Sequence, residues 1–118
     1  MKTVKNWQLI KANRTDPRVR QFYNMPYLLK YNGRDVIAPC GSTDNISLFQ
    51  EGNDLILLSS NSRYGYVGVT VYDLELNEIT EYFCQNMEDD LLPVLGVSID
   101  KFFDYTYLYQ AKLIYNLL

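Results

Sequence analysis

The sequence contains no histidine, and this absence excludes a large share of enzyme chemistry. Histidine is the side chain whose unperturbed pKa lies nearest neutrality. A general acid or base in this chain would therefore need a strongly shifted carboxylate, lysine, cysteine or tyrosine. Most catalytic triads, which rely on an imidazole, are excluded as well. We expect a protein that is not an enzyme.

Cysteine is scarce, with Cys40 and Cys84 as its two occurrences. Two thiolates without histidine cannot complete a four-ligand zinc site unless carboxylates or a second chain contribute. The acidic residues do not follow the spacing of a calcium-binding loop. A disulfide would require an oxidising compartment, so we interpret both cysteines as thiols, more typical of inert packing than of nucleophiles. We expect no metal and no cofactor.

Long apolar runs are also missing, since none approaches the roughly 20 residues of a membrane helix. The first residues, MKTVKNWQLIKANR, lack the apolar core and small-residue cleavage site of a secretory signal. We therefore expect a cytoplasmic protein without membrane contact. The chain has 118 residues, 47% of them hydrophobic and 21% charged. This size and composition indicate one globular domain over residues 1–118.

Charge is distributed unevenly along the chain. Residues 1–34 hold eight basic residues and one acid, a net charge of +7, whereas residues 35–118 hold three basic and 13 acidic residues, a net charge of −10. Such asymmetry indicates a charged partner. Two other interpretations stay open: the basic segment pairs with the acidic body of its own chain, or with that of a second copy in a homodimer.

The middle of the chain predicts antiparallel hairpins. Asn32-Gly33 stands between two apolar runs and is typical of a type I′ turn. Glu51-Gly52-Asn53 separates ISLFQ from DLILLSS, and the apolar residues 55–58 predict a strand covered on both faces. Residues 66–72 and 79–84 flank a longer loop and form a third hairpin.

Two parts of the strand pattern each allow two interpretations. Gly68, inside a strand, indicates a bulge or a close backbone approach. Near the N-terminus, VKNWQLIKA fits either a short helix or a strand with Trp7 and Leu9 on one side. We prefer the strand.

The last third of the chain predicts helices. Asn86 is placed to cap a helix whose first turn is acidic, Pro93 distorts it, Gly96 ends it and Ser98 caps the next. The final segment fits a helix with one face formed by residues 103, 107, 111, 114 and 118. Alternate residues from 103 to 113 also fit a strand, but the length favours the helix.

Together these signals predict an α+β fold. We expect an antiparallel β-meander of about five to seven strands with C-terminal helices packed on one face.

Eight residues are candidates for contact with a partner protein. The chain has eleven tyrosines, a residue enriched in protein interfaces, and two of them lie in the exposed-looking loop SNSRYGY. Acidic residues cluster around the third hairpin loop and again near residue 89, where they would attract a basic surface. The predicted contact residues are Tyr64, Tyr66, Asp73, Glu75, Glu78, Glu88, Asp89 and Asp90.

A basic patch is the alternative site. Arg14, Arg18 and Arg20 could grip phosphates while the nearby Trp7, Phe22 and Tyr23 stack on bases. The acidity of the whole chain disfavours nucleic acid, because phosphate neutralisation supplies most of the non-specific affinity.

The sequence therefore predicts a small, acidic, non-enzymatic inhibitor that binds another protein and occludes its basic or nucleic-acid-handling surface. Immunity proteins that neutralise toxins and phage-encoded antagonists of host defence are of this general type. One alternative is a nucleic-acid-binding regulator that uses the basic N-terminal segment. The other is a module that sequesters a small molecule in an aromatic pocket between sheet and helix.

Overall fold

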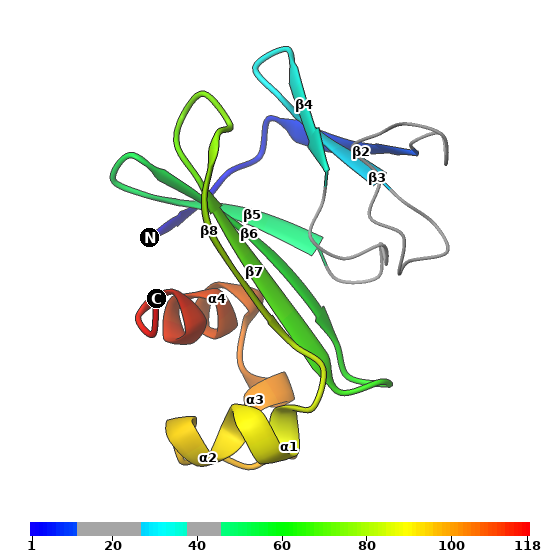
Figure 1. Ribbon diagram of the computed structural model, residues 1–118, viewed down its shortest axis with the longest axis vertical. Helices are drawn as coiled ribbons and strands as arrows, with labels where there is room; N and C mark the ends of the chain where they lie inside the picture. Colours follow the sequence, from blue (N-terminus) through cyan, green and yellow to red (C-terminus); the bar gives the residue numbers. More distant parts are fainter. Residues whose placement is uncertain (12–26, 38–45) are drawn as a thin grey trace.

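The molecule is built in three layers (Figure 1). The computed structural model describes residues 1–11, 27–37 and 46–118. A five-stranded antiparallel sheet forms the middle layer, with strand order β1-β5-β6-β7-β8. Four short helices cover one of its faces, and a three-stranded sheet of order β2-β3-β4 packs on the other. The predicted α+β fold, with an antiparallel sheet and C-terminal helices, is confirmed.

The elements follow one another closely along the described chain. The strands are β1 (Lys2–Thr3), β2 (Trp7–Lys11), β3 (Tyr27–Tyr31), β4 (Arg34–Ile37), β5 (Ile46–Glu51), β6 (Asp54–Asn61), β7 (Tyr66–Tyr72) and β8 (Glu78–Cys84). The helices are α1 (Met87–Asp90), α2 (Leu92–Leu95), α3 (Ile99–Asp104) and α4 (Tyr107–Tyr115). Strands β5 to β8 form the predicted meander, each paired with the next.

Strand β6 is buried on both faces, as predicted. Leu55, Ile56, Leu57 and Leu58 all have 0% exposure. Because side chains alternate along a strand, the four residues divide between two cores. The helix-side core contains Phe49, Ile56, Leu58, Val67, Val69, Val71, Cys84, Met87, Leu91, Leu92, Phe102, Ala111 and Ile114. The second-sheet core contains Val4, Leu29, Leu48, Leu55, Leu57, Tyr72 and Leu76.

Packing and a long-range hydrogen bond join the three-stranded sheet to the main sheet. Its β3–β4 hairpin turns at Asn32 and Gly33, whose φ angles of 52° and 75° are those of the predicted type I′ turn. Arg34, which follows the turn, donates from Nη1 to the carbonyl oxygen of Glu75 over 2.6 Å. The N-terminal segment is a strand, as preferred, and Trp7 and Leu9 both pack against the second-sheet core.

The bulge lies elsewhere than at Gly68. Gly68 pairs in regular register with Ser59 on one side and Phe83 on the other, so the first of its two predicted interpretations, a bulge, is wrong. The register shifts instead at the start of β8, where Thr80 pairs with Val71 and Glu78 with Tyr72. The register shifts because β8 has one residue more than β7 at this point, and that residue has no partner on β7.

Most of the residues predicted to begin or end a helix do so in the structure. Gly96 ends α2 in the left-handed conformation, with φ of 69°. The Oγ atom of Ser98 accepts a hydrogen bond from the backbone N–H of Lys101 over 3.2 Å and caps α3. Asn86 does not cap α1 with its side chain, contrary to expectation. Its Nδ2 atom donates to Oδ2 of Asp89 instead, over 2.9 Å.

The final segment is helical, as preferred, but it is broken in two. Tyr105 and Thr106 are extended, and the Oγ1 atom of Thr106 accepts from the N–H of Tyr109 to start α4. The single predicted face is therefore wrong at two of its five positions, since Tyr107 and Leu118 are exposed.

Buried Gln110 stabilises this break. Its side chain has 0% exposure, and its Nε2 atom donates to the carbonyl oxygens of Phe102 and Tyr105, each over 3.2 Å. These carbonyls lie at the end of α3, where helix geometry leaves acceptors without intrahelical donors. Gln110 thus takes the place of the backbone donors that a continuous helix would supply.

We predict that Gln110→Leu lowers the free energy of unfolding by about 1–3 kcal/mol, because the carbonyl oxygens of Phe102 and Tyr105 each lose one donor and only that of Phe102 keeps another, the backbone N–H of Tyr105. Chemical denaturation of the two proteins measures the difference. The exposed neighbour Lys112→Gln serves as control and is expected to change stability by less than about 0.5 kcal/mol. Equal stability of Gln110→Leu and the wild type would show that the hydrogen bonds contribute nothing.

Tyr115 joins α4 to the β5–β6 hairpin and generates a pH-dependent prediction. Its hydroxyl donates to Oδ2 of Asp54 over 2.6 Å, and this hydrogen bond, together with burial, raises the pKa of Tyr115 to about 12. A raised pKa means that the folded state favours the neutral phenol. The stabilisation is therefore full below pH 10 and is lost as the pH rises towards 12.

We expect Tyr115→Phe to destabilise the protein by about 1 kcal/mol at neutral pH. The stability difference from the wild type should shrink as the pH rises from 10 to 12. Tyr82, whose pKa is also raised to about 12, titrates in both proteins and cancels in the comparison. Urea denaturation across this pH range gives the difference, and a constant gap would contradict the role given to the hydrogen bond.

Candidate interaction surface

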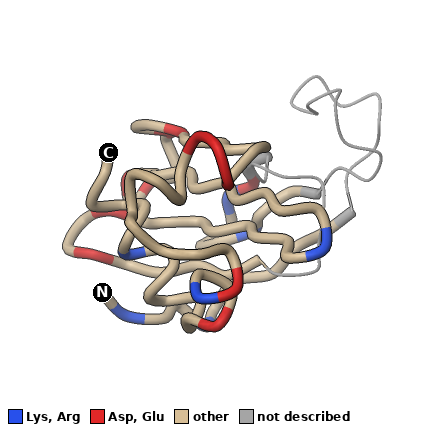
Figure 2. Tube along the Cα trace, turned by 90° about the horizontal axis from the view of Figure 1, so that it is seen from below, with Lys and Arg blue, Asp and Glu red and all other residues tan. Residues whose placement is uncertain are grey.

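The structure divides the eight predicted contact residues between the two ends of the main sheet. Asp73, Glu75 and Glu78 lie at the turn that joins β7 to β8. Strand β8 then runs the length of the sheet before α1 begins, so the acids of α1 lie at the opposite end (Figure 1). Figure 2 shows the acidic residues in separate stretches of the described trace. One continuous patch of all six acids is therefore not formed.

The β7–β8 turn uses its acids largely for its own structure. The Oδ1 atom of Asp73 accepts from the backbone N–H groups of Glu75 and Asn77, each over 2.9 Å, and its Oδ2 accepts from Nδ2 of Asn77 over 3.0 Å. The hydrogen bonds from Asn77 lower the pKa of Asp73 below its ordinary value. Asp73 thus has a structural role in the turn, whereas Glu75 and Glu78 are exposed beside it.

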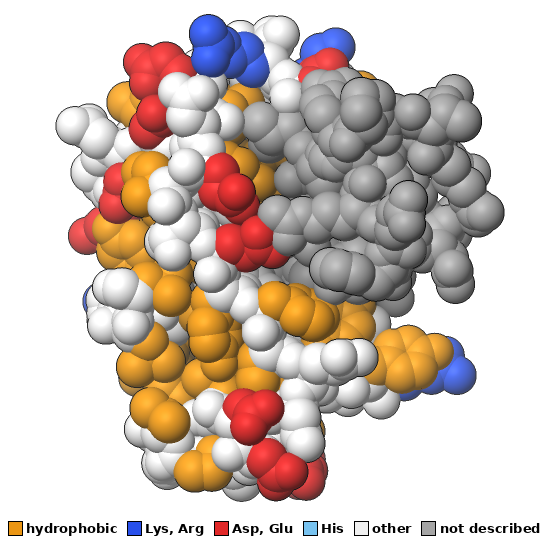
Figure 3. Space-filling model, in the orientation of Figure 1, with side chains coloured by type: hydrophobic (Ala, Val, Ile, Leu, Met, Phe, Trp, Pro, Cys, Tyr) orange, Lys and Arg blue, Asp and Glu red, His pale blue; other side chains and the backbone are white. Residues whose placement is uncertain are grey.

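The other end of the main sheet carries both tyrosines, at the β6–β7 turn and the start of β7, and the three acids of α1 (Figure 1). Glu88, Asp89 and Asp90 are all exposed on α1. Tyr66 starts β7 at this end, and its ring centroid lies 5.9 Å from that of Phe83. We name this region the α1-end surface, formed by Tyr64, Tyr66, Glu88, Asp89 and Asp90. Figure 3 shows acidic side chains at the lower tip of the molecule beside a broad apolar area.

Tyr64 is the most exposed large apolar residue of the described chain, at 68%. The turn that carries it is fixed by Asn61, whose Oδ1 atom accepts from the backbone N–H of Tyr64 over 3.0 Å. The guanidinium carbon of Arg63 lies 5.5 Å from the centre of the Tyr64 ring, a cation–π contact. A projecting ring on an ordered turn offers contact area at a small entropic cost.

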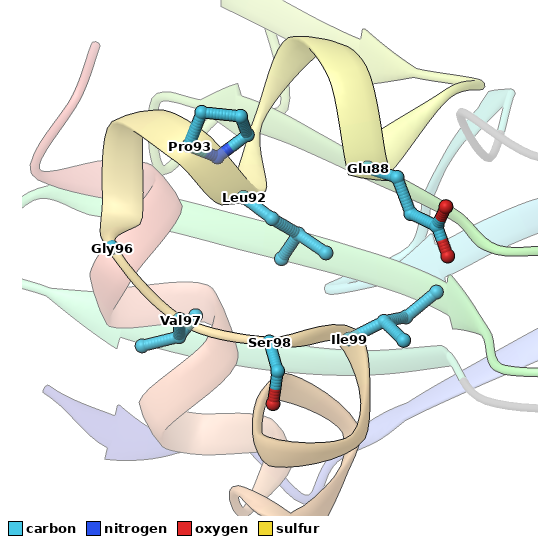
Figure 4. Close-up of a pocket in the computed structure, with 7 residues that line it drawn as sticks. All are labelled: Glu88, Leu92, Pro93, Gly96, Val97, Ser98 and Ile99. Carbon is cyan, nitrogen blue, oxygen red and sulfur yellow. The ribbon is translucent and has the colours of Figure 1, made fainter.

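Two grooves flank α1. The helix groove, about 470 Å³, is lined by Glu88, Leu92, Pro93, Gly96, Val97, Ser98 and Ile99 (Figure 4). The strand groove, about 650 Å³, is lined by Tyr82, Phe83, Cys84, Gln85, Asn86 and Asp90. Each groove therefore has one carboxylate of α1 in its lining. Sequence analysis missed both: the leucine, valine and isoleucine of the helix groove are indistinguishable from ordinary core residues, and the residues of the strand groove read as the end of a strand and the start of a helix.

Cys84 and Tyr82 both line the strand groove. Cys84 is a free and buried thiol. Burial and the neighbouring Cys84 side chain raise the pKa of Tyr82 to about 12. Within residues 1–11, 27–37 and 46–118, no group of three or more acidic or cysteine residues is arranged to hold a metal.

The alternative basic site, formed by Arg14, Arg18 and Arg20, lies outside the described residues, and so does Cys40. Trp7, which was expected to stack on bases with them, is half-buried, and its Nε1 donates to the carbonyl oxygen of Val4 over 2.9 Å. None of the described helices has the length and apolar character needed to cross a bilayer.

Comparison with protein-family models, with curated proteins and with solved structures gave no match to this chain. Function is therefore inferred from the geometry and charge of the α1-end surface itself.

The hydrogen bonds of Asp73 generate a prediction. Asp73→Ala removes three of them, whereas Asp73→Asn keeps a carbonyl oxygen that can still accept from the backbone. We expect thermal midpoints in the order wild type, Asn variant, Ala variant, from highest to lowest. The lowered pKa also implies that the stabilisation by Asp73 is complete above its ordinary pKa near 3.8 and is lost as the pH falls below it. Thermal scans of the three proteins at neutral and acidic pH check both points.

If Asp73→Ala melted with the wild type at neutral pH, the carboxylate would have no role in the turn. Glu75→Ala is the control, since this neighbouring carboxylate is exposed and its removal leaves the hydrogen bonds of Asp73 intact.

Proposed function

We propose that this protein is a non-enzymatic binding protein whose α1-end surface docks onto a basic surface of another protein and occludes it. The observation that carries the proposal is the gathering of an exposed tyrosine, three exposed carboxylates and two grooves at one end of the molecule. Tyrosine is enriched among the residues that dominate binding energy, and flanking charge steers a complementary partner.

Occlusion fits this surface better than catalysis does. The carboxylates of α1 are exposed on a short surface helix, where water has free access. Catalysis by electrostatic preorganisation requires a site that excludes water, whereas both grooves are open at the surface. Toxin-neutralising immunity proteins and antagonists of host defence act by occlusion, and we place the protein in this general class, acting in the cytoplasm.

The alternatives receive less support. Nucleic-acid binding would rest on arginines outside the described residues and on Trp7, whose ring packs against the second-sheet core. Sequestration of a small molecule would need a pocket between sheet and helices, but the helix-side core fills that space. The two grooves lie at the surface instead.

A matched pair of charge reversals tests the proposal. Glu88→Lys and Glu75→Lys each replace one exposed glutamate, at opposite ends of the main sheet, so their effect on net charge is identical. The partner is first identified by affinity purification from the native host with mass spectrometry. The dissociation constants of its complexes with the wild type and with each variant are then measured. We expect Glu88→Lys to weaken binding at least about tenfold and Glu75→Lys to change it less than about twofold, because only the former lies in the interface.

Tyr64→Ala is expected to weaken binding at least about tenfold as well, because the ring is the main apolar group of the surface. Circular dichroism confirms that each variant is folded. Equal losses in Glu88→Lys and Glu75→Lys would reduce the effect to overall charge, and unchanged binding by Glu88→Lys and Tyr64→Ala would refute this surface.

A further inference from the structure

The helix groove has an apolar interior with a single carboxylate at one end. Leu92, with 5% exposure, forms its floor, and Pro93, Val97 and Ile99 belong to its walls. Figure 4 shows the side chains of Glu88 and Ile99 pointing toward one another from the two sides, with Leu92 beside them. The groove thus combines an aliphatic surface with a charged end.

Backbone conformation keeps the groove open. Gly96 takes a φ of 69° as α2 ends, and it contributes no side chain. A methyl group added at Gly96 would find no atom within 4 Å, so this side of the groove faces open space. The chain then reverses through Val97 and enters α3, which sets the second wall opposite the first.

Glu88 is the charged group that a ligand would meet. The other polar side chain in the lining, Ser98, points away from the opening, and its Oγ atom accepts from the N–H of Lys101 as the cap of α3. The carboxylate of Glu88 forms no hydrogen bond or ion pair with any residue of the described chain. Its charge is thus available to a partner.

Three classes of occupant can be compared on this geometry. An anion would be repelled by Glu88 and by its neighbours Asp89 and Asp90. A purely apolar side chain would cover the carboxylate without replacing its water, which is costly. A lysine or arginine side chain places its methylene groups on Leu92 and Ile99 and its cation at the carboxylate.

We propose that the helix groove is a socket for one lysine or arginine side chain presented by the partner protein. This inference rests on the proposed function and adds the chemistry by which the α1-end surface recognises its target. The groove volume of about 470 Å³ holds one long side chain with accompanying water. The basic surface of the partner would thus be recognised by a specific side-chain contact as well as by long-range electrostatic attraction.

Two short peptides test the socket directly, without the partner. One is a capped Gly-Ala-Arg-Ala-Gly sequence, and the other carries norleucine in place of arginine. Both are titrated into isotope-labelled protein, and the amide shifts of Leu92, Val97 and Ile99 are followed by NMR. We expect saturable, millimolar binding of the arginine peptide and at least about tenfold weaker binding of the norleucine peptide, because only arginine makes a charge-assisted hydrogen bond.

Glu88→Gln keeps the size of the side chain and removes its charge. We expect this variant to bind the arginine peptide at least about tenfold more weakly than the wild type, and Glu75→Gln, the control at the other end of the sheet, to bind it equally. Equal affinity of the two peptides, equal binding by Glu88→Gln, or shifts confined to residues outside the groove would each overturn the socket.

The failures of the two proposals are distinguishable. Loss of partner binding by Glu88→Lys, together with peptide shifts that do not depend on Glu88, rejects the socket and retains the α1-end surface. Peptide binding that depends on Glu88, together with full partner binding by Glu88→Lys, would show that the groove binds a basic side chain but that the partner does not use it, which rejects both the α1-end surface and the socket as the partner's contact.

Discussion

The two-sided burial of β6 is the constraint on which the rest of the molecule depends. Residues 55–58 are fully excluded from water, and burial of each such side chain contributes roughly 1.5–3 kcal/mol. Since their side chains point alternately to the two faces, the strand is stable only when both are covered. Helices cover one face and the three-stranded sheet covers the other. The three-layer arrangement follows from this single apolar run.

Local signals in the sequence were sufficient where a residue type has one main structural use. Asn32 and Gly33 supply a type I′ turn, Gly96 a left-handed helix end, and Ser98 a cap, and the structure contains all three. The run at 55–58 was interpreted correctly for the same reason, because no exposed strand is apolar on both faces.

The signals failed where distant residues decide the outcome. The break between α3 and α4 depends on Gln110, which reaches back to the carbonyls of Phe102 and Tyr105, and no periodicity reveals that contact. The docking of the second sheet likewise uses Arg34 and a backbone carbonyl 41 residues away. For the surface, Tyr64 was predicted as exposed and is exposed, whereas the grouping of the acids by sequence proximity ignored the seven residues of β8 between them.

The short helices beside the surface carry a thermodynamic consequence. Helices α1 and α2 have four residues each, far fewer than the dozen or so at which an isolated helix becomes even marginally stable in water. They persist because Met87, Leu91 and Leu92 are anchored in the interior. The proposed recognition face therefore exists only while the whole domain is folded, and a partner that bound there would stabilise the folded state. Saturation of this face would shift the unfolding equilibrium by mass action, so the resistance of the protein to proteolysis would rise with the supply of its target.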